Sequence, residues 1–116
     1  MKHFKRDESE QFDFGGLLIT DLTAGASLSA SVAQIEVPQG ATHPRAKSTR
    51  SDKYYLCTSG SVAFTSEEQQ VRLTSPELLV IPANEWFEYR NETNETARML
   101  LFHVPPFDLD CEVFDG

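Results

Sequence analysis

The chain has 116 residues, of which 40% are hydrophobic, and this is enough for one domain, residues 1–116, around a single core. It carries 18 acidic against 10 basic side chains, for a formal net charge of −8. Such a chain lacks the basic face of a general nucleic-acid binder and is repelled by anionic membranes. Residues 1–11 are charged throughout and have no apolar signal core, so we expect a cytoplasmic protein.

Turn signals recur about every eight to twelve residues and separate short segments rich in β-forming residues. This rhythm favours an all-β sandwich or barrel over a helical fold. A proline pair at 105–106 ends the last of these segments, since proline cannot donate to a strand ladder. The predicted strands are 16–21, 27–37, 53–59, 61–66, 70–73, 78–81, 87–91 and 97–104.

Two turn-punctuated segments, 40–60 and 76–91, resemble the two sequence motifs of the cupin family. The motif positions that are kept are Gly40, Gly60, Pro82 and Asn91. The resemblance covers roughly residues 28–110 and implies a double-stranded β-helix, the jelly-roll barrel of small single-domain cupins.

Two departures from the motifs are compatible with the fold. Asn84 stands where the family has glycine, and asparagine is the other residue that most readily enters the left-handed region. Pro76 replaces another glycine at the start of a strand, where a missing N–H costs little. We therefore expect both turns to survive.

The positions that hold a metal ion in the cupin family carry other residues in this chain. Alanine and phenylalanine offer no lone pair, and lysine brings a positive charge where first-row metals need imidazoles, carboxylates or thiolates. The sequence therefore predicts no metal at the usual position and no other cofactor. The four replaced positions are Ala46, Ser48, Lys53 and Phe87.

A relocated metal site is the alternative. His43, Asp52 and His103 would provide two imidazoles and one carboxylate. Side chains alternate along a strand, however, so Asp52 should face away from its neighbour Lys53.

The cupin resemblance implies that the motif positions 53 and 87 point into the barrel, and the same alternation then predicts which other side chains do so. Lys53 and Tyr55 share one face of their strand, and Phe87 and Tyr89 share one face of theirs. Metal-free cupins that isomerise nucleotide sugars use a tyrosine and a histidine inside the barrel, and His103 is the histidine best placed here. Lys53, Tyr55, Tyr89 and His103 are therefore the candidate catalytic residues, with core packing as the alternative for the tyrosines and the histidine.

Lys53 is open to three interpretations. A buried lysine loses charge stability, so it could act as a base or form a Schiff base with a carbonyl compound. It could instead stay charged and hold an anionic ligand, or pair with an acid such as Glu36.

A basic segment at 45–53 contrasts with the acidic chain around it. Arginine forks beside a pocket favour a carboxylate or phosphate ligand, whereas a solvated loop is the plainer interpretation. The predicted ligand-binding residues are Arg45, Ser48, Arg50 and Phe87.

These observations favour a cupin barrel that binds a small, anionic organic molecule without a metal. A metal-independent isomerase, epimerase or lyase and a metal-dependent enzyme with relocated ligands are the alternatives. The resemblance also implies a homodimer, and the segment from Gly16 to Thr20 is suited to pairing between edge strands.

Overall fold

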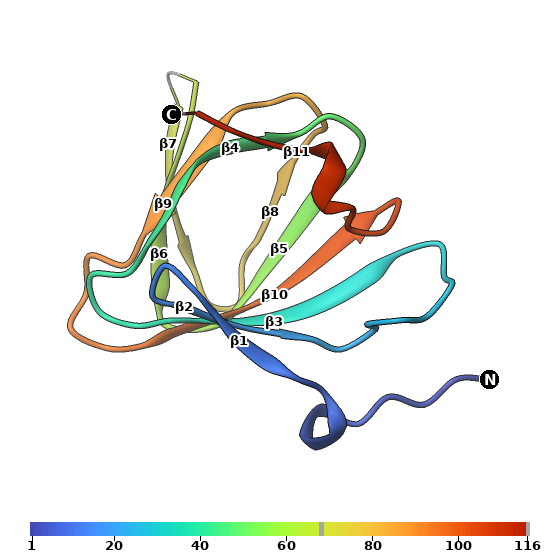
Figure 1. Cartoon of the computed structure of the whole chain (residues 1–116). Coiled ribbons are helices and arrows are strands. Elements are labelled where there is room, and N and C mark those ends of the chain that lie inside the picture. The colour runs from blue at the N-terminus through green and yellow to red at the C-terminus, as the bar shows by residue number, and fades with distance from the viewer. Residues whose placement is uncertain (68, 116) are drawn as a thin grey trace.

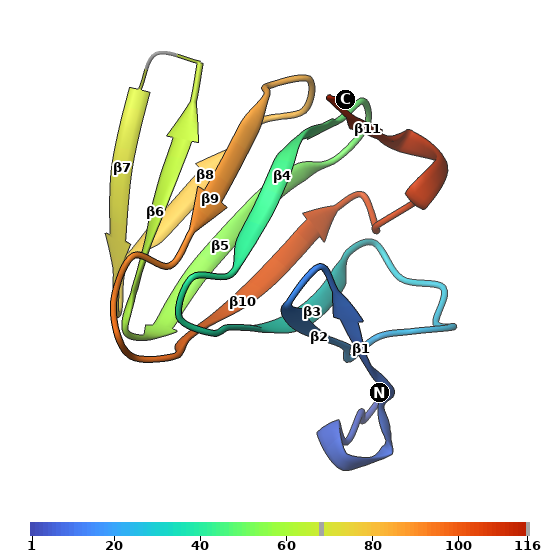
Figure 2. The same cartoon turned by 60° about the vertical axis from the view of Figure 1, so that its left-hand side comes forward.

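A computed structural model describes residues 1–67 and 69–115 of the chain. Two antiparallel sheets face each other around a common interior, as Figure 1 shows. We call them sheet A, with strand order β1-β2-β3-β10-β5-β8, and sheet B, with strand order β11-β4-β9-β6-β7. Figure 2 shows the two layers from the side. This is the all-β jelly-roll barrel that the sequence predicts.

Sheet A contains strands from both halves of the chain, because β10 returns to lie between β3 and β5. Its strands are β1 (Gln11–Phe14), β2 (Leu17–Asp21), β3 (Ser31–Val37), β5 (Asp52–Ser59), β8 (Leu78–Ile81) and β10 (Ala97–Val104).

Sheet B has the three-residue strand β11 at one edge and the six-residue strand β7 at the other. Its strands are β4 (Thr42–Ser48), β6 (Ser61–Ser66), β7 (Gln69–Thr74), β9 (Phe87–Arg90) and β11 (Glu112–Phe114). Two 3₁₀ turns complete the described chain, η1 (Arg6–Glu8) before β1 and η2 (Leu109–Cys111) before β11.

Alternation along the strands turns one face of each sheet toward the interior. In β10 the burial alternates residue by residue, and β5 and β9 show the same period of two. The inward faces of both sheets form one buried cluster, which includes Leu17, Ile35, Tyr55, Met99, Val62, Phe64 and Phe87.

The eight predicted strands all correspond to observed ones, but β3 starts at Ser31 rather than at residue 27. Three observed strands were not predicted: β1, β4 and β11. Strand β4 is polar and contains Pro44, and its pairing with β9 shifts register between His43 and Ala46. A proline at a register shift is tolerated in a strand, but it weakens the pattern by which a strand is recognised.

Two motif residues show why their positions are constrained. Gly60 has a φ of +74°, and a Cβ there would lie 3.2 Å from the Cα of Ala97. Asn84 has a φ of +69°, which confirms that asparagine occupies the left-handed turn in place of glycine.

In the single chain, residues 16–20 do not form a free edge. Strand β2 pairs with β1 on one side and with β3 on the other, so both of its edges are occupied. The free edge of sheet A at that side belongs to β1. Within the described ranges, no helix is long and apolar enough to cross a membrane.

Candidate functional site

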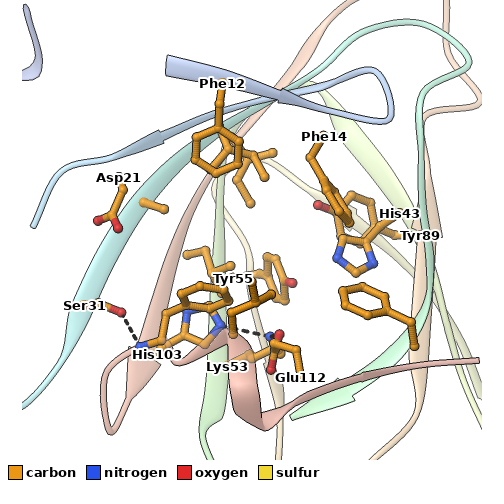
Figure 3. A pocket seen from close by; sticks show the side chains of 17 residues that line it. Phe12, Phe14, Asp21, Ser31, His43, Lys53, Tyr55, Tyr89, His103 and Glu112 are labelled. Atoms are coloured by element: carbon orange, nitrogen blue, oxygen red, sulfur yellow. Dashed lines mark hydrogen bonds and ion pairs between the residues drawn. The ribbon is translucent and has the colours of Figure 1, made fainter. Parts of the chain in front are cut away.

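A cavity of about 350 Å³ opens between the two sheets at the side where β1 and β11 are the edge strands. Figure 3 shows it with its lining side chains, which come from both sheets and from the segment after β10. Ligand pockets for small molecules start at about 300 Å³, so the cavity is large enough for an organic molecule of modest size.

A buried polar cluster lies at one end of the cavity. Lys53 Nζ lies 2.9 Å from His103 Nε2 and 2.5 Å from Glu112 Oε1. The three residues come from β5, β10 and β11, so the cluster exists only where both sheets meet. The Lys53 and Glu112 side chains are 3% and 7% exposed, which makes this a buried ion pair.

Burial shifts the protonation equilibria of this cluster. Desolvation lowers the pKa of Lys53, and the Glu112 carboxylate opposes that change by stabilising the ammonium form. Desolvation, assisted by the charge of Lys53, lowers the pKa of His103 to about 3. His103 is therefore neutral near pH 7, and its Nε2 lone pair faces the lysine.

His43 lies on another wall of the cavity, toward Tyr89 in Figure 3. Its Nδ1 is 2.7 Å from the carbonyl oxygen of Pro44. A carbonyl only accepts, so Nδ1 carries the proton and Nε2 keeps a lone pair. The ring stacks on Phe87 with centroids 5.1 Å apart.

The environment of His43 keeps the imidazole neutral. Desolvation is the main cause, and it lowers the pKa to about 4; the hydrogen bond to Pro44 opposes this shift, and the charge of Lys53 adds to it. Near pH 7 this side chain is an unprotonated base with a fixed tautomer.

Two buried tyrosines complete the inner wall. Tyr55 and Tyr89 make an edge-to-face contact with centroids 5.8 Å apart. Burial raises the pKa of both phenols, so both hydroxyls stay protonated and act as hydrogen-bond donors. The Tyr89 hydroxyl is buried without a hydrogen-bond partner among the described residues. A buried donor without a partner is costly, so a ligand atom is its natural acceptor.

Aromatic and polar side chains surround the remaining walls. Phe12 and Phe14 of β1 reach over the cavity from above in the view of Figure 3, and Asp21 and Ser31 lie on the left. Asp21 Oδ1 accepts a hydrogen bond from the Thr23 backbone N–H at 3.1 Å, and no side chain or backbone group of the described residues donates to its other oxygen.

The structure brings together all four residues predicted to be catalytic. Lys53, Tyr55, Tyr89 and His103 line the cavity, as the strand alternation requires. The acidic partner of Lys53 is Glu112, so the suggested pairing with Glu36 is wrong. Glu36 lies 3.8 Å from Arg6 and 3.7 Å from Arg98 instead.

The four residues predicted to bind ligand do not line the cavity. Arg45 pairs with Asp115 at 3.1 Å, and Arg50 Nη2 donates to the Pro106 carbonyl at 2.6 Å. Ser48 Oγ accepts from the backbone N–H of Ser51 at 2.8 Å, and Phe87 is completely buried behind the His43 ring. The basic segment, 45–53, covers the end of β4, the turn after it and the start of β5. Its two arginines are held by neighbours outside the cavity, and only Lys53 of this segment's basic residues reaches the cavity.

The residues present do not fit the metal ion that the cupin resemblance would imply. Ala46, Ser48, Lys53 and Phe87 are all buried at the family's ligand positions, and an ammonium group stands among them. For the relocated set, Asp52 is the obstacle, because its Oδ1 accepts from the Ala83 N–H outside the cavity. Across residues 1–67 and 69–115, no three His, Cys, Asp or Glu side chains gather in a way that could hold a metal.

Sequence reasoning missed two residues of the site. Glu112 lies in a three-residue strand that carries no recognisable pattern. His43 was considered only as a metal ligand, although its place on the chain beside a proline carbonyl gives it a fixed tautomer. The alternation of Phe12 and Phe14 with polar residues was a period-two signal that would have revealed β1.

The cupin domain family matches residues 33–103, and the chain belongs to this family. No curated protein sequence matches the chain.

Among solved structures, a variant of Streptomyces Pac13 with uridine has a TM-score of 0.87 and 23% sequence identity, covering 100% of this chain and 92% of that chain. Pac13 is described as a nucleoside dehydratase. KdgF from Halomonas sp. has a TM-score of 0.78 and 15% identity over 90% of this chain and 94% of that chain. A sugar phosphate isomerase from Silicibacter pomeroyi has a TM-score of 0.75 and 16% identity over 89% and 75%. At these identities the likeness shows the shared fold.

Proposed function

We propose that the cavity binds a neutral sugar-like or nucleoside-like molecule and eliminates water from it by acid–base chemistry without a metal ion. The observation that carries the proposal is the placement of a neutral histidine base, His43, in the same buried cavity as a lysine ammonium group, Lys53.

The charges of the cavity favour a neutral ligand over the anion expected from the basic segment. Lys53 is the cationic side chain among the lining residues, and Glu112 already neutralises it. Asp21 adds a further carboxylate to the wall. An anion entering this cavity would gain no uncompensated cation, and it would lose its own hydration.

The shape and polarity of the walls favour a molecule with a flat apolar part and several hydroxyl groups. Phe12, Phe14 and the His43 ring offer aromatic faces, on which a planar ring can stack. The Tyr89 hydroxyl and the Asp21 carboxylate offer a donor and an acceptor. This combination suits a sugar that carries a heterocycle.

The proposed reaction begins with a C–H bond that a neighbouring carbonyl has made acidic. The proton moves to His43 Nε2, and the electrons of the C–H bond form a carbon–carbon double bond as the adjacent C–O bond breaks. The imidazolium then gives the proton to the departing hydroxyl. Water leaves, and the protein returns to its starting state.

Lys53 supports this reaction electrostatically. Two of its three N–H directions are used by His103 and Glu112, which leaves one for a ligand oxygen. An enolate oxygen that develops there is stabilised by a donor already fixed in a buried site.

The arrangement favours elimination over epimerisation. An epimerase that acts by two bases needs one on each face of the reacting carbon. His103 is occupied by Lys53, and the pKa values of both tyrosines are raised, so His43 is the free imidazole among the described cavity residues. The Asp21 carboxylate on the wall already accepts from the Thr23 backbone N–H and hydroxyl, which weakens it as a second base. The dehydratase activity of Pac13 and its binding of uridine support the same choice of reaction and ligand class.

The first test is calorimetric titration with uridine and with uridine monophosphate, which differ by one charged group. We expect uridine to bind and the monophosphate to bind at least about tenfold more weakly, a difference of about 1.4 kcal/mol. Tighter binding of the monophosphate would establish the anionic ligand instead. Absence of binding by uridine and by other neutral nucleosides and sugars would overturn the proposed ligand class.

The second test separates an enzyme from a binding protein. A panel of β-hydroxycarbonyl sugars is incubated with the protein, with and without a chelator, and products are examined by mass spectrometry. The proposal requires loss of one water molecule at a rate that the chelator does not change. Binding without loss of water would make the protein a sensor or carrier.

A further inference from the structure

Two polar side chains on one wall of the cavity each keep one hydrogen-bonding position free. Asp21 at the end of β2 and Ser31 at the start of β3 both line the cavity, and Figure 3 shows them together on its left side. Asp21 pairs with Ala33, which lies two residues from Ser31 on the same face of β3. The two side chains are therefore diagonal neighbours across the strand pair, close enough to reach adjacent atoms of one ligand.

Asp21 is an acceptor whose orientation is already fixed. Its Oδ1 accepts from the Thr23 backbone N–H at 3.1 Å and from the Thr23 hydroxyl. Thr23 is itself held, because its Oγ1 accepts the backbone N–H of Val32 at 3.0 Å. No group of the described residues donates to the second carboxylate oxygen of Asp21, so this oxygen is left for a ligand donor.

Ser31 supplies the complementary donor. Its Oγ accepts the backbone N–H of Phe107 at 2.8 Å, which fixes the position of the oxygen. The hydroxyl hydrogen has no acceptor among the described residues, and a hydroxyl can donate while its oxygen accepts. The wall therefore presents one acceptor and one donor side by side, each held in place by a backbone group of the protein.

The space next to this pair has apolar faces. Between Asp21 and Tyr55 the strand register places Ala33 and Leu101, which both line the cavity. Phe12 reaches over the same end of the cavity from above in Figure 3. A flat ring can bury both of its faces there while its polar edge meets the pair. A sugar in that place would turn hydroxyl groups toward apolar walls, where they find no partners.

The pair lies at a distance from the reactive groups that suits the far end of a nucleoside. Lys53 pairs with His103, and His103 pairs with Ser31, so two strand spacings or about 10 Å separate the backbones of Lys53 and Ser31. In the proposed reaction the sugar lies between Lys53 and His43. Figure 3 shows His43 and Asp21 on opposite sides of the cavity, so the rest of such a ligand extends toward Asp21.

We propose that Asp21 and Ser31 select the ligand's heterocycle: a ring N–H donates to Asp21, and the neighbouring carbonyl oxygen accepts from Ser31. An imide such as that of uracil has a carbonyl on both sides of its N–H, so it offers this edge in either orientation. Its N–H is acidic and therefore a strong donor to a carboxylate. The cavity of about 350 Å³ is near the lower limit for ligand pockets, which favours one ring over two. The inference rests on the proposed function for the position of the sugar.

The test is calorimetric titration with uridine and with 3-methyluridine, in which a methyl group replaces the imide hydrogen. The wild type should bind 3-methyluridine at least about tenfold more weakly, because the donor to Asp21 is lost. In Asp21→Asn the Thr23 N–H retains the amide oxygen, so the amide N–H₂ group faces the ligand. Uridine should then bind at least about tenfold more weakly, and its advantage over 3-methyluridine should fall below about threefold. Ser31→Ala should weaken both ligands by about three- to tenfold, because both keep the carbonyl.

The matched control is Asp13→Asn, because Asp13 also accepts a backbone N–H, that of Gly16 at 2.8 Å, but lies outside the cavity. This variant should bind both ligands like the wild type. Equal affinity of the wild type for the two ligands would overturn this inference and leave the proposed function standing, whereas no binding of uridine would overturn both. A preference for uridine that persists in Asp21→Asn would show that another group binds the N–H. Weaker binding of 2′-deoxyuridine than of 3-methyluridine would assign the pair to a sugar hydroxyl instead.

Discussion

Lys53 Nζ lies 2.5 Å from Glu112 Oε1, and this contact joins sheet A to sheet B across one end of the cavity. Lys53 belongs to a central strand, whereas Glu112 belongs to a three-residue edge strand. This ion pair therefore has two roles: it includes a residue of the candidate site, and it attaches the last strand to the barrel.

The ion pair should contribute strongly to stability when only one partner is removed. Breaking a buried pair leaves an uncompensated charge and costs about 3–5 kcal/mol. We expect a loss of this size for Glu112→Leu, and a loss well below the sum of the single changes for Lys53→Met combined with Glu112→Leu. Urea denaturation of the wild type, the two single variants and the double variant gives the four free energies of unfolding that this double-mutant cycle needs.

The matched control is Asp115→Asn, which breaks the exposed pair with Arg45 on the same end of the chain. Exposed pairs contribute about 0–1 kcal/mol. Equal effects at Glu112 and Asp115, or additive effects in the cycle, would mean that Glu112 is not held as a buried partner of Lys53.

His43 should matter for turnover far more than for folding. His43→Gln keeps a polar side chain but removes the imidazole base, so kcat should fall by about 10² to 10⁴ while uridine still binds. Single-turnover kinetics on a substrate found in the sugar panel, together with calorimetry, check both parts. His3→Gln, at an exposed N-terminal position, is the control. An unchanged kcat in His43→Gln would remove His43 from the mechanism.

Stability should fall as the pH drops below about 6.5. The pKa values of His43 and His103 are lowered to about 4 and about 3 in the folded protein, so the unfolded chain binds more protons over this interval. Each imidazole then favours folding above pH 6.5 and loses that contribution as the pH approaches its folded pKa. The slope is at most about 1.4 kcal/mol per pH unit for each group.

Chemical denaturation between pH 7.5 and pH 4 checks this, since ΔG of unfolding can be followed at each pH. His103→Phe should reduce the slope, because one of the two titrating imidazoles is gone. A wild-type stability that is flat across this interval would contradict the burial of both rings.

Tyr89→Phe should separate binding from folding. The Tyr89 hydroxyl has no partner among the described residues, so its removal should leave the free energy of unfolding within about 0.5 kcal/mol or raise it slightly. Uridine affinity should fall by the value of one hydrogen bond, about 0.5–1.5 kcal/mol. Tyr54→Phe, on the outward face of β5, should not change uridine affinity. A large loss of stability in Tyr89→Phe would indicate an intramolecular role instead.

Asn84 should tolerate glycine but not alanine. Its φ of +69° costs alanine about 1–2 kcal/mol, whereas glycine adopts this conformation without steric cost. Asn84→Ala should therefore lower the thermal midpoint, and Asn84→Gly should keep it close to the wild-type value. Asn94→Ala, also exposed but outside the positive-φ region, should change stability by no more than about 0.5 kcal/mol.

The period of two along β5 and β9 made much of the site predictable. Once Lys53 was placed inward, the burial of Tyr55 followed, and Phe87 and Tyr89 were placed by the same argument. The cavity lining was predicted correctly at Lys53, Tyr55, Tyr89 and His103, whereas Phe87 is buried behind the His43 ring. Neither β11 nor the approach of Glu112 to Lys53 could be predicted, because residues that are 59 positions apart meet through the closure of the barrel.

The basic segment shows the opposite outcome. A cluster of like charges in sequence suggests a common target, but strand alternation and a turn send the side chains in different directions. Arg45 lies over Trp86 on the outer face, with its guanidinium 5.0 Å from the ring, and Arg50 turns toward Pro106. The closeness of these basic residues in the sequence therefore predicted a local concentration of positive charge. It did not predict that their side chains share one binding site.

The aromatic rings of Phe14 and Phe114 lie 6.0 Å apart, where the outermost strands β1 and β11 of the two sheets approach each other. The rim of the cavity at this seam is lined by Phe12, Phe14 and Phe114 of these two edge strands, whereas Ile35, Tyr55, Tyr89 and Leu101 line it deeper inside and also belong to the buried core cluster. A change at the rim therefore alters the wall of the cavity with little effect on the core, whereas a change deeper inside affects both. During evolution the rim residues on β1 and β11 can therefore change so that different ligands bind, while the buried core is kept. This helps explain how one barrel fold serves unrelated chemistries.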